Sequence, residues 1–376
     1  MCAVGREETL QRALKESGPY LGQFPVLVES ILKGSAWECN GHTRALMLSA
    51  LGKARGQAVQ PIIAFYLDAS ADKRLLLRPV FGRIGKDAQA AGPVLRAELD
   101  KAQTSAEDKM SIKVVLAAMG QATSAELDEI ASALSVDSEV GLRAMWTMCE
   151  CEHNAWIPES VEKPIIKMME KPRRTPDNLQ WRLRNEACLA LTTFGERTDA
   201  HVLKALQDEY EGIVRDAGAH PEMRLEMRLW AGLGLAKADS SRRRAMMLSI
   251  LKEVPGSMLA WQVRPLMEWM CSGMPDDDLL WVADALLSEH KHEPLSAALV
   301  ILYAVGPQAR SAVPRLVSLI RLTDDDSTRT GAAETLGMIA DPLDLPLIEK
   351  MASDPALSDD AKKALQACIR AVKLHD

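Results

Sequence analysis

One short pattern recurs nine times along the 376-residue chain, and it constrains the fold more than any other feature. Two small or apolar residues, often with a glycine, are followed by a break in the apolar run. The copies are ALGKA (50–54), FGRIG (81–85), AMGQA (118–122), MCECE (148–152), LTTFG (191–195), GLGLA (232–236), MCSGM (270–274), YAVGP (303–307) and LGMIA (336–340). Their spacing of roughly 35 residues is typical of repeat proteins, in which each unit packs on the next.

Each unit has the pattern of two helices. In the last complete unit, residues 329–339 carry apolar or small residues at 332, 333, 336 and 339, which is the spacing of one helical face. The pair Asp341-Pro342 then ends the helix, because proline cannot continue the hydrogen-bond ladder. A second helix is predicted over 344–351 and a closing helix over 358–373. Stacked helix pairs share one apolar core, so the sequence predicts an all-α fold.

The segment 312–341 resembles a HEAT repeat. The family pattern places a proline near the start of one helix, then aspartate, then arginine, then an Ala-Ala-Leu-Gly helix. The residues that match it are Pro314, Asp324, Asp325, Asp326, Arg329, Ala332, Ala333, Leu336 and Gly337. The resemblance is good over 43–100 and 295–353 and loose between 140 and 290. It implies a structural role for the aspartate and arginine side chains, as a ladder between repeats.

The resemblance implies a right-handed α-α superhelix of the HEAT/armadillo type, with about nine helix pairs plus capping helices. Residues 1–40 are predicted to form amino-terminal capping helices, 41–357 the repeat array, and 358–376 the carboxyl-terminal cap. In such an array we expect the concave surface to be built from the second helix of each pair.

Charge and apolar runs exclude several classes of function. The chain has 45 Lys and Arg against 52 Asp and Glu, a net charge of −7, which disfavours a general nucleic-acid binder. No window approaches 18 uncharged apolar residues, so we expect no membrane span. The charged start and the seven scattered cysteines favour a cytoplasmic protein with reduced thiols.

The repeat pattern specifies a fold and no chemistry. The sequence has no Gly-rich phosphate loop, nucleophile elbow or paired catalytic carboxylates. We therefore predict a non-catalytic scaffold or adaptor without a cofactor, which holds a protein or peptide on its concave face. An accessory subunit of a modifying enzyme is a second possibility, and the oligomeric state stays open.

The candidate partner-binding residues lie where the period is interrupted, since long loops on an array often carry function. Trp156 lies in the irregular segment 152–164. A basic stretch over 163–184 includes Lys163 and Lys167, and its candidate contacts are Arg173, Arg174, Trp181, Arg182 and Arg184. Some HEAT-like proteins are DNA glycosylases, so a nucleic-acid partner at this stretch is the alternative function.

Two further features have structural interpretations that we favour. Cys149, Cys151 and His153 resemble part of a zinc site, but the two cysteines fall at core positions of the repeat and no second ligand pair completes the set. We predict no metal. Six tryptophans cluster in the middle of the chain, and we predict that most of them are core residues, with Trp156 as the exception. They are Trp146, Trp156, Trp230, Trp261, Trp269 and Trp281.

Overall fold

The computed structural model describes residues 25–33, 47–48, 50–136, 138–151, 159–170, 178–192, 200–215, 221–252, 274–289 and 292–373. These residues form α-helices and short 3-10 helices and include no strand, which confirms the all-α prediction. The described helices fall into two compact units, and the chain passes from one to the other between Ser240 and Ser241, inside the predicted 41–357 array.

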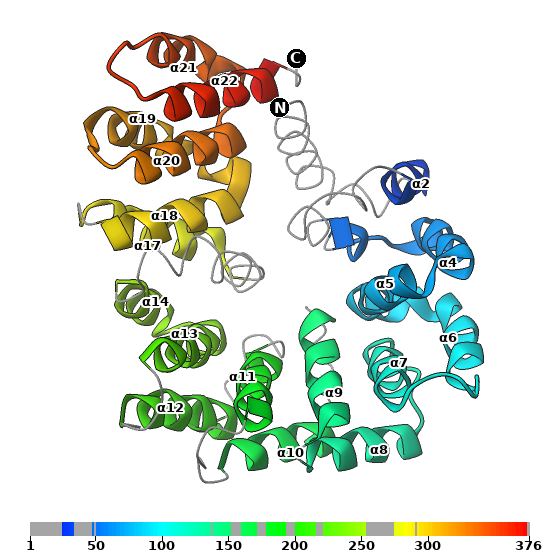
Figure 1. Cartoon of the computed structure of the whole chain (residues 1–376). Helices are drawn as coiled ribbons and strands as arrows, with labels where there is room; N and C mark the ends of the chain where they lie inside the picture. The colour runs from blue at the N-terminus through cyan, green and yellow to red at the C-terminus, as the bar shows by residue number, and fades with distance from the viewer. Residues whose placement is uncertain are drawn as a thin grey trace. The chain divides into compact units, whose positions relative to one another are not determined.

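The first unit contains eleven described α-helices. They are α2 (Pro25–Lys33), α4 (Val59–Asp68), α5 (Ala71–Ile84), α6 (Gly92–Leu99), α7 (Ala106–Ala118), α8 (Ser124–Leu134), α9 (Glu139–Glu150), α10 (Glu159–Glu170), α11 (Asn178–Thr192), α12 (Ala200–Arg215) and α13 (Pro221–Ala238). Helices α5, α7, α9, α11 and α13 each pack on the next and form one layer, while α8, α10 and α12 pack in a second layer behind it. Figure 1 shows α5, α7, α9, α11 and α13 on the inner side of this unit.

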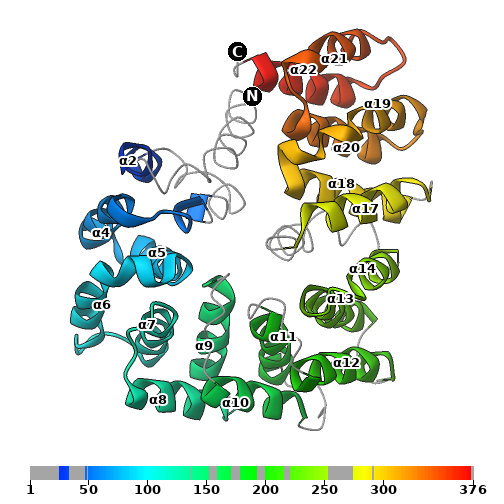
Figure 2. The ribbon, with the colours of Figure 1, turned by 180° about the vertical axis from the view of Figure 1, so that it is seen from behind.

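The inner layer consists of the first helices of the pairs, which carry the small-residue pattern. The expectation that second helices build the inner surface is therefore wrong for this unit, as Figure 2 shows from behind. The physical reason is helix spacing, because helices on the inner side of a curve must approach more closely than those outside it. Gly82 of α5 illustrates the approach: a Cβ atom built there would lie 2.3 Å from the Cys151 sulfur, just after α9.

The second unit continues the alternation of paired helices. Its described elements are α14 (Arg243–Leu251), α17 (Asp276–Leu287), α18 (His292–Val305), α19 (Val313–Leu322), α20 (Asp326–Ile339), α21 (Leu345–Ala352) and α22 (Asp359–Lys373). Helices α18, α20 and α22 pack successively, and α17, α19 and α21 each pack against one of them. The predicted closing helix matches α22, whose first turn donates a main-chain hydrogen bond from Ala361 to the Ser358 hydroxyl at 3.4 Å.

The two units share one local structure at their helix-pair junctions. Gly85 and Gly306 both adopt positive φ, 69° and 71°, and end α5 and α18. Each glycine begins a seven-residue 3-10 segment, Gly85–Ala91 (η4) and Gly306–Ala312 (η6), after which proline occupies the first turn of the next helix. Glycine suits this position because it has no Cβ to clash in the left-handed region. The repeated junction supports a common structural unit.

Arginine side chains provide a second shared feature. Arg184 of α11 donates from Nη2 to the main-chain oxygen of Met169, in the last turn of α10, at 2.8 Å. Arg329 of α20 donates from Nε to the main-chain oxygen of Ile320, in the last turn of α19, at 3.3 Å. A cation at the carboxyl end of a helix satisfies free carbonyl groups and opposes the negative end of the helix dipole. Each arginine thereby joins the second helix of one pair to the first helix of the next.

Candidate functional site

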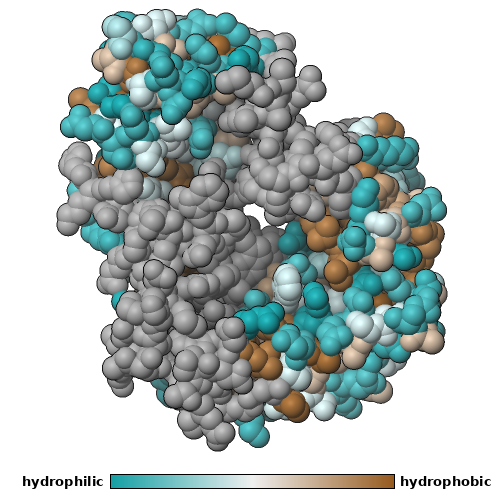
Figure 3. All heavy atoms as spheres, in the orientation of Figure 1, coloured by the Kyte–Doolittle hydropathy of each residue, from teal (hydrophilic) through white to brown (hydrophobic). Residues whose placement is uncertain are grey.

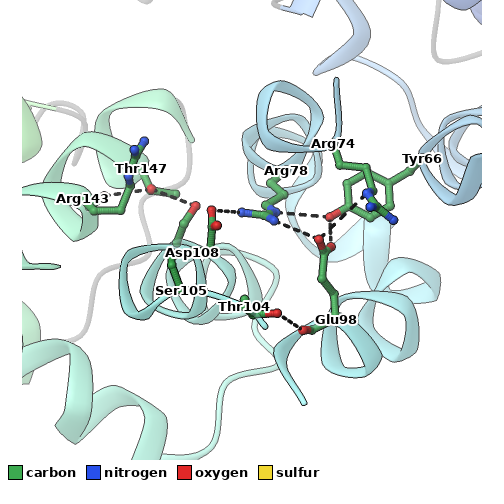
Figure 4. A network of polar contacts seen from close by, with 10 residues as sticks. Tyr66, Arg74, Arg78, Glu98, Thr104, Ser105, Asp108, Arg143 and Thr147 are labelled. Carbon is green, nitrogen blue, oxygen red and sulfur yellow. Dashed lines mark hydrogen bonds and ion pairs between the residues drawn. The ribbon is translucent and has the colours of Figure 1, made fainter. Parts of the chain in front are cut away.

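A largely buried polar network lies between α4, α5, α6 and α7, and Figure 4 shows its side chains pointing toward one another. Arg78 of α5 donates to Glu98 of α6 at 2.9 Å and to Asp108 of α7 at 2.6 Å. Its Nε atom also donates to the Tyr66 hydroxyl of α4 at 3.3 Å, and that hydroxyl donates to Glu98. Only 5% of the Arg78 side-chain surface is exposed. One arginine thus links four helices.

The charges of this network satisfy one another. Burial would raise the pKa of Glu98, but hydrogen bonds from Tyr66 and Arg78 hold it below its ordinary value. Burial and the neighbouring Glu98 carboxylate raise the pKa of Tyr66, so the phenol stays protonated and keeps donating. Because these four side chains pair with one another, we assign Tyr66, Arg78, Glu98 and Asp108 the role of a structural clamp between the four helices.

A different set of polar groups reaches solvent on α9 and α11. Along α9, residues 139, 143, 146 and 150 follow the three-to-four spacing of one helical face, whereas residues 142, 145 and 148 are buried. Along α11, residues 182 and 186 share a face, and 184, 188 and 191 are buried. We call the set of Glu139, Arg143, Trp146, Glu150, Arg182 and Glu186 the α9–α11 face.

Trp146 is the central apolar residue of the α9–α11 face. It is 43% exposed, which contradicts its predicted place in the core. The Arg143 guanidinium lies 4.9 Å from the centre of the Trp146 ring, in cation–π contact. Arg182 of α11 pairs with Glu139 of α9 at 3.5 Å and connects the two helices across the face. An exposed tryptophan held by its neighbours is the type of residue that dominates binding energies at protein interfaces.

Two carboxyl groups on the same face are held partly out of water. Burial, with the charge of nearby Glu150, raises the pKa of Glu186 to about 7, although a hydrogen bond from Cys149 and the charge of Arg182 act in the opposite direction. Burial also raises the pKa of Glu150, although Arg83, Arg143 and a hydrogen bond from Trp146 act in the opposite direction. Perturbed carboxyl groups of this kind are concentrated at functional sites. The α9–α11 face is therefore our candidate binding surface.

The cysteines beside this face have structural roles. The Cys149 thiol donates to the main-chain oxygen of Glu186 at 3.7 Å and thereby contacts α11. Cys151 is buried against Gly82, and burial raises the pKa of its thiol, so it stays protonated. His153 lies outside the described residues. Within the described parts of the chain, no three His, Cys, Asp or Glu side chains are grouped closely enough to hold a metal ion.

The predicted contacts of the basic stretch separate in the structure. Lys163 and Lys167 are exposed on α10, in the second layer, whereas Arg182 is exposed on the α9–α11 face of α11. Arg184 is 5% exposed and pairs with Glu209 of α12, so it is not accessible to a partner. Trp156, Arg173 and Arg174 lie outside the described residues, and Trp181 is on α11 with a side chain that is not described.

Outside this stretch, Trp281 differs from the sequence prediction in the same way as Trp146. It is 44% exposed on α17, with the Arg244 guanidinium 5.4 Å from the centre of its ring.

Sequence reasoning missed Trp146, Glu150 and Glu186 as candidate site residues. The charged positions 139, 143 and 150 around Trp146 were the signal that could have found them, since together they mark the polar face of α9.

No protein-family model matches the chain, and no curated protein is significantly similar to it. None of the described helices is long and apolar enough to span a bilayer. On the face shown in Figure 3, hydrophobic residues form several small groups among hydrophilic ones. At the level the structure establishes, the chain is an all-helical protein.

The raised pKa of Glu186 predicts how stability varies with pH. Its folded-state pKa of about 7 lies above the ordinary 4.5, so the folded protein binds the proton more tightly than the unfolded chain does. The corresponding stability is complete below about pH 4.5 and is lost as pH rises to about 7. Glu186→Gln cannot ionise, so its stability relative to wild type should increase between pH 5 and pH 8. Urea unfolding of both proteins at these two pH values measures the change, and a constant difference would contradict the assignment.

Proposed function

We propose that the protein is a non-catalytic scaffold of the HEAT-repeat type, a right-handed helical array that holds a segment of a partner protein against its inner layer. The observation that carries the proposal is the exposure of Trp146 on a helix of that layer. Tryptophan is enriched among interface residues that contribute most to binding. A surface built on packed helices is preformed, so binding costs little ordering entropy on the scaffold's side.

A nucleic-acid partner at residues 163–184 has less support. Phosphate binding requires cations that converge on one surface. Lys163 and Lys167 lie in the second layer, Arg182 lies on the inner layer, and Arg184 lies in the core. The α9–α11 face itself carries three glutamates and two arginines around its tryptophan. Its two arginines are engaged with Glu139 and with the Trp146 ring, so the face does not present a cluster of cations to phosphate groups.

Site-specific photocrosslinking tests the proposal. A photoreactive phenylalanine derivative at position 139, where the side chain is 58% exposed, samples the space beside Trp146. The matched control is position 67, since Leu67 is 57% exposed on α4, a helix outside the inner layer. After irradiation in native lysate, we expect a protein adduct of discrete mass at position 139 and none at position 67.

Nuclease treatment before irradiation separates the two candidate functions. The adduct at position 139 should be unchanged by nuclease if the partner is a protein. Loss of the adduct after nuclease treatment, equal adducts at both positions, or no adduct at position 139 would each contradict the scaffold proposal.

A further inference from the structure

The α9–α11 face carries three carboxyl groups, those of Glu139, Glu150 and Glu186, and two arginines. The three described arginines nearest its acids are all engaged. Arg83 of α5 donates from Nε to the main-chain oxygen of Glu150, and Arg182 pairs with Glu139. Arg143 lies over the Trp146 ring. Among the described residues, no ion pair joins the carboxyl group of Glu150 or Glu186 to an arginine or lysine.

The two carboxyl groups lie beside the exposed tryptophan. Glu150 is one helical turn beyond Trp146 on α9 and accepts a hydrogen bond from it. Glu186 is on α11, close enough to Glu150 for the two charges to interact. The Cys149 thiol, which contacts the backbone of Glu186, holds the two helices together at this point. Within the described part of the chain, the surface thus combines one large apolar side chain with two carboxyl groups that form no ion pair, although the charges of Arg83, Arg143 and Arg182 act on them.

We propose that the α9–α11 face binds a basic segment of the partner protein, with Trp146 as the apolar anchor and Glu150 and Glu186 as the acceptors for a lysine or arginine side chain. This inference rests on the proposed scaffold function and assigns the chemistry of the partner. A cationic side chain has a long apolar stem, which can pack on the tryptophan while its charged end reaches the carboxyl groups. Complementary charge at an interface selects the partner and its register.

The protonation of the two acids agrees with this assignment. Burial raises the pKa of both Glu150 and Glu186, which shows that the surrounding arginines do not compensate for the lost water. A lysine or arginine placed between them would favour the charged forms and lower both pKa values. An acidic partner would have the opposite effect and would meet like charge.

Phage display of random dodecapeptides tests the chemistry of the partner before the partner itself is identified. Selection is made on the full-length wild-type chain, after removal of phage that bind the Glu150→Gln/Glu186→Gln variant. We expect the surviving peptides to be enriched in lysine and arginine. Enrichment of acidic peptides, or no enrichment over the unselected library, would overturn the inference.

Fluorescence anisotropy with one selected peptide then tests the residues. Glu150→Gln/Glu186→Gln should weaken binding by about 10-fold or more, because a desolvated charge contact is lost. Trp146→Ala should weaken it by about 10-fold, as expected for an interface anchor. The matched control is Trp281→Ala, since Trp281 is equally exposed and is also covered by an arginine. This control should bind like wild type, and an equal loss in it would overturn the inference.

Charge and folding controls complete the experiment. Asp276→Asn/Asp277→Asn converts the same number of carboxyl groups to amides at exposed positions of α17 and should leave peptide binding unchanged. Urea unfolding at pH 8 should show that the glutamine variants are at least as stable as wild type, which would exclude unfolding as the cause of weaker binding. If the position 139 adduct persists while the selected peptides are not basic, the scaffold function stands and the assigned partner chemistry fails.

Discussion

Replacing Arg78 by methionine is expected to lower the free energy of unfolding by about 3–5 kcal/mol, because Glu98 and Asp108 would lose their buried cation. Arg78 is 5% exposed at its side chain and joins α5 to α4, α6 and α7. The loss of the Arg78 hydrogen bonds therefore weakens the contacts between four helices. Urea unfolding followed by far-UV circular dichroism measures the change.

The matched control for this prediction is Arg182→Met in the same unit. Arg182 pairs with Glu139, but both side chains are more than half exposed. Exposed ion pairs contribute about 1 kcal/mol or less, so this variant should remain close to wild type. The double variant Arg78→Met/Glu98→Met should recover part of the lost stability, since it removes one unpaired charge. Equal losses for the two single arginine variants would contradict the clamp role.

Gly82→Ala is the second substitution with a large expected effect on stability. We expect it to destabilise the protein, whereas replacing glycine by alanine inside a helix usually stabilises it. Alanine in place of glycine inside a helix normally stabilises it by about 0.5–1 kcal/mol. At Gly82 the new Cβ would lie 2.3 Å from the Cys151 sulfur and 3.0 Å from its Cβ, in a buried contact. We expect overpacking to destabilise the protein by about 1–3 kcal/mol.

Gly331→Ala provides the control for the glycine prediction. Gly331 also lies inside a helix, α20, but a Cβ there would meet only Leu299 at an ordinary 3.4 Å. This variant should be as stable as wild type or more stable. Adding Cys151→Ala to Gly82→Ala should recover part of the loss, because it removes the clashing sulfur. If Gly82→Ala were stabilising in thermal unfolding, the close approach of α5 to the end of α9 would be wrong.

Much of the local structure could be predicted from the sequence. The helix expected over 329–339 lies within α20, and those expected over 344–351 and 358–373 correspond to α21 and α22. These predictions succeeded because apolar spacing, proline and glycine act within a few residues of each other. The site was less predictable. Arg182 and Arg184 are two residues apart in one basic stretch, yet one is exposed and the other is buried against Glu209.

The sequence by itself determined the helical class, the paired helices and the glycine junctions, since these follow from local periodicity and backbone sterics. Only the tertiary structure decided which residues form the inner layer, that Trp146 is exposed, and that the charges of Glu150 and Glu186 interact across α9 and α11. The reason is that a repeat pattern marks the core-facing side of each helix, whereas the character of the opposite side depends on which neighbouring helices pack beside it. Charges that are far apart along the chain interact here only because two helices of one layer are adjacent.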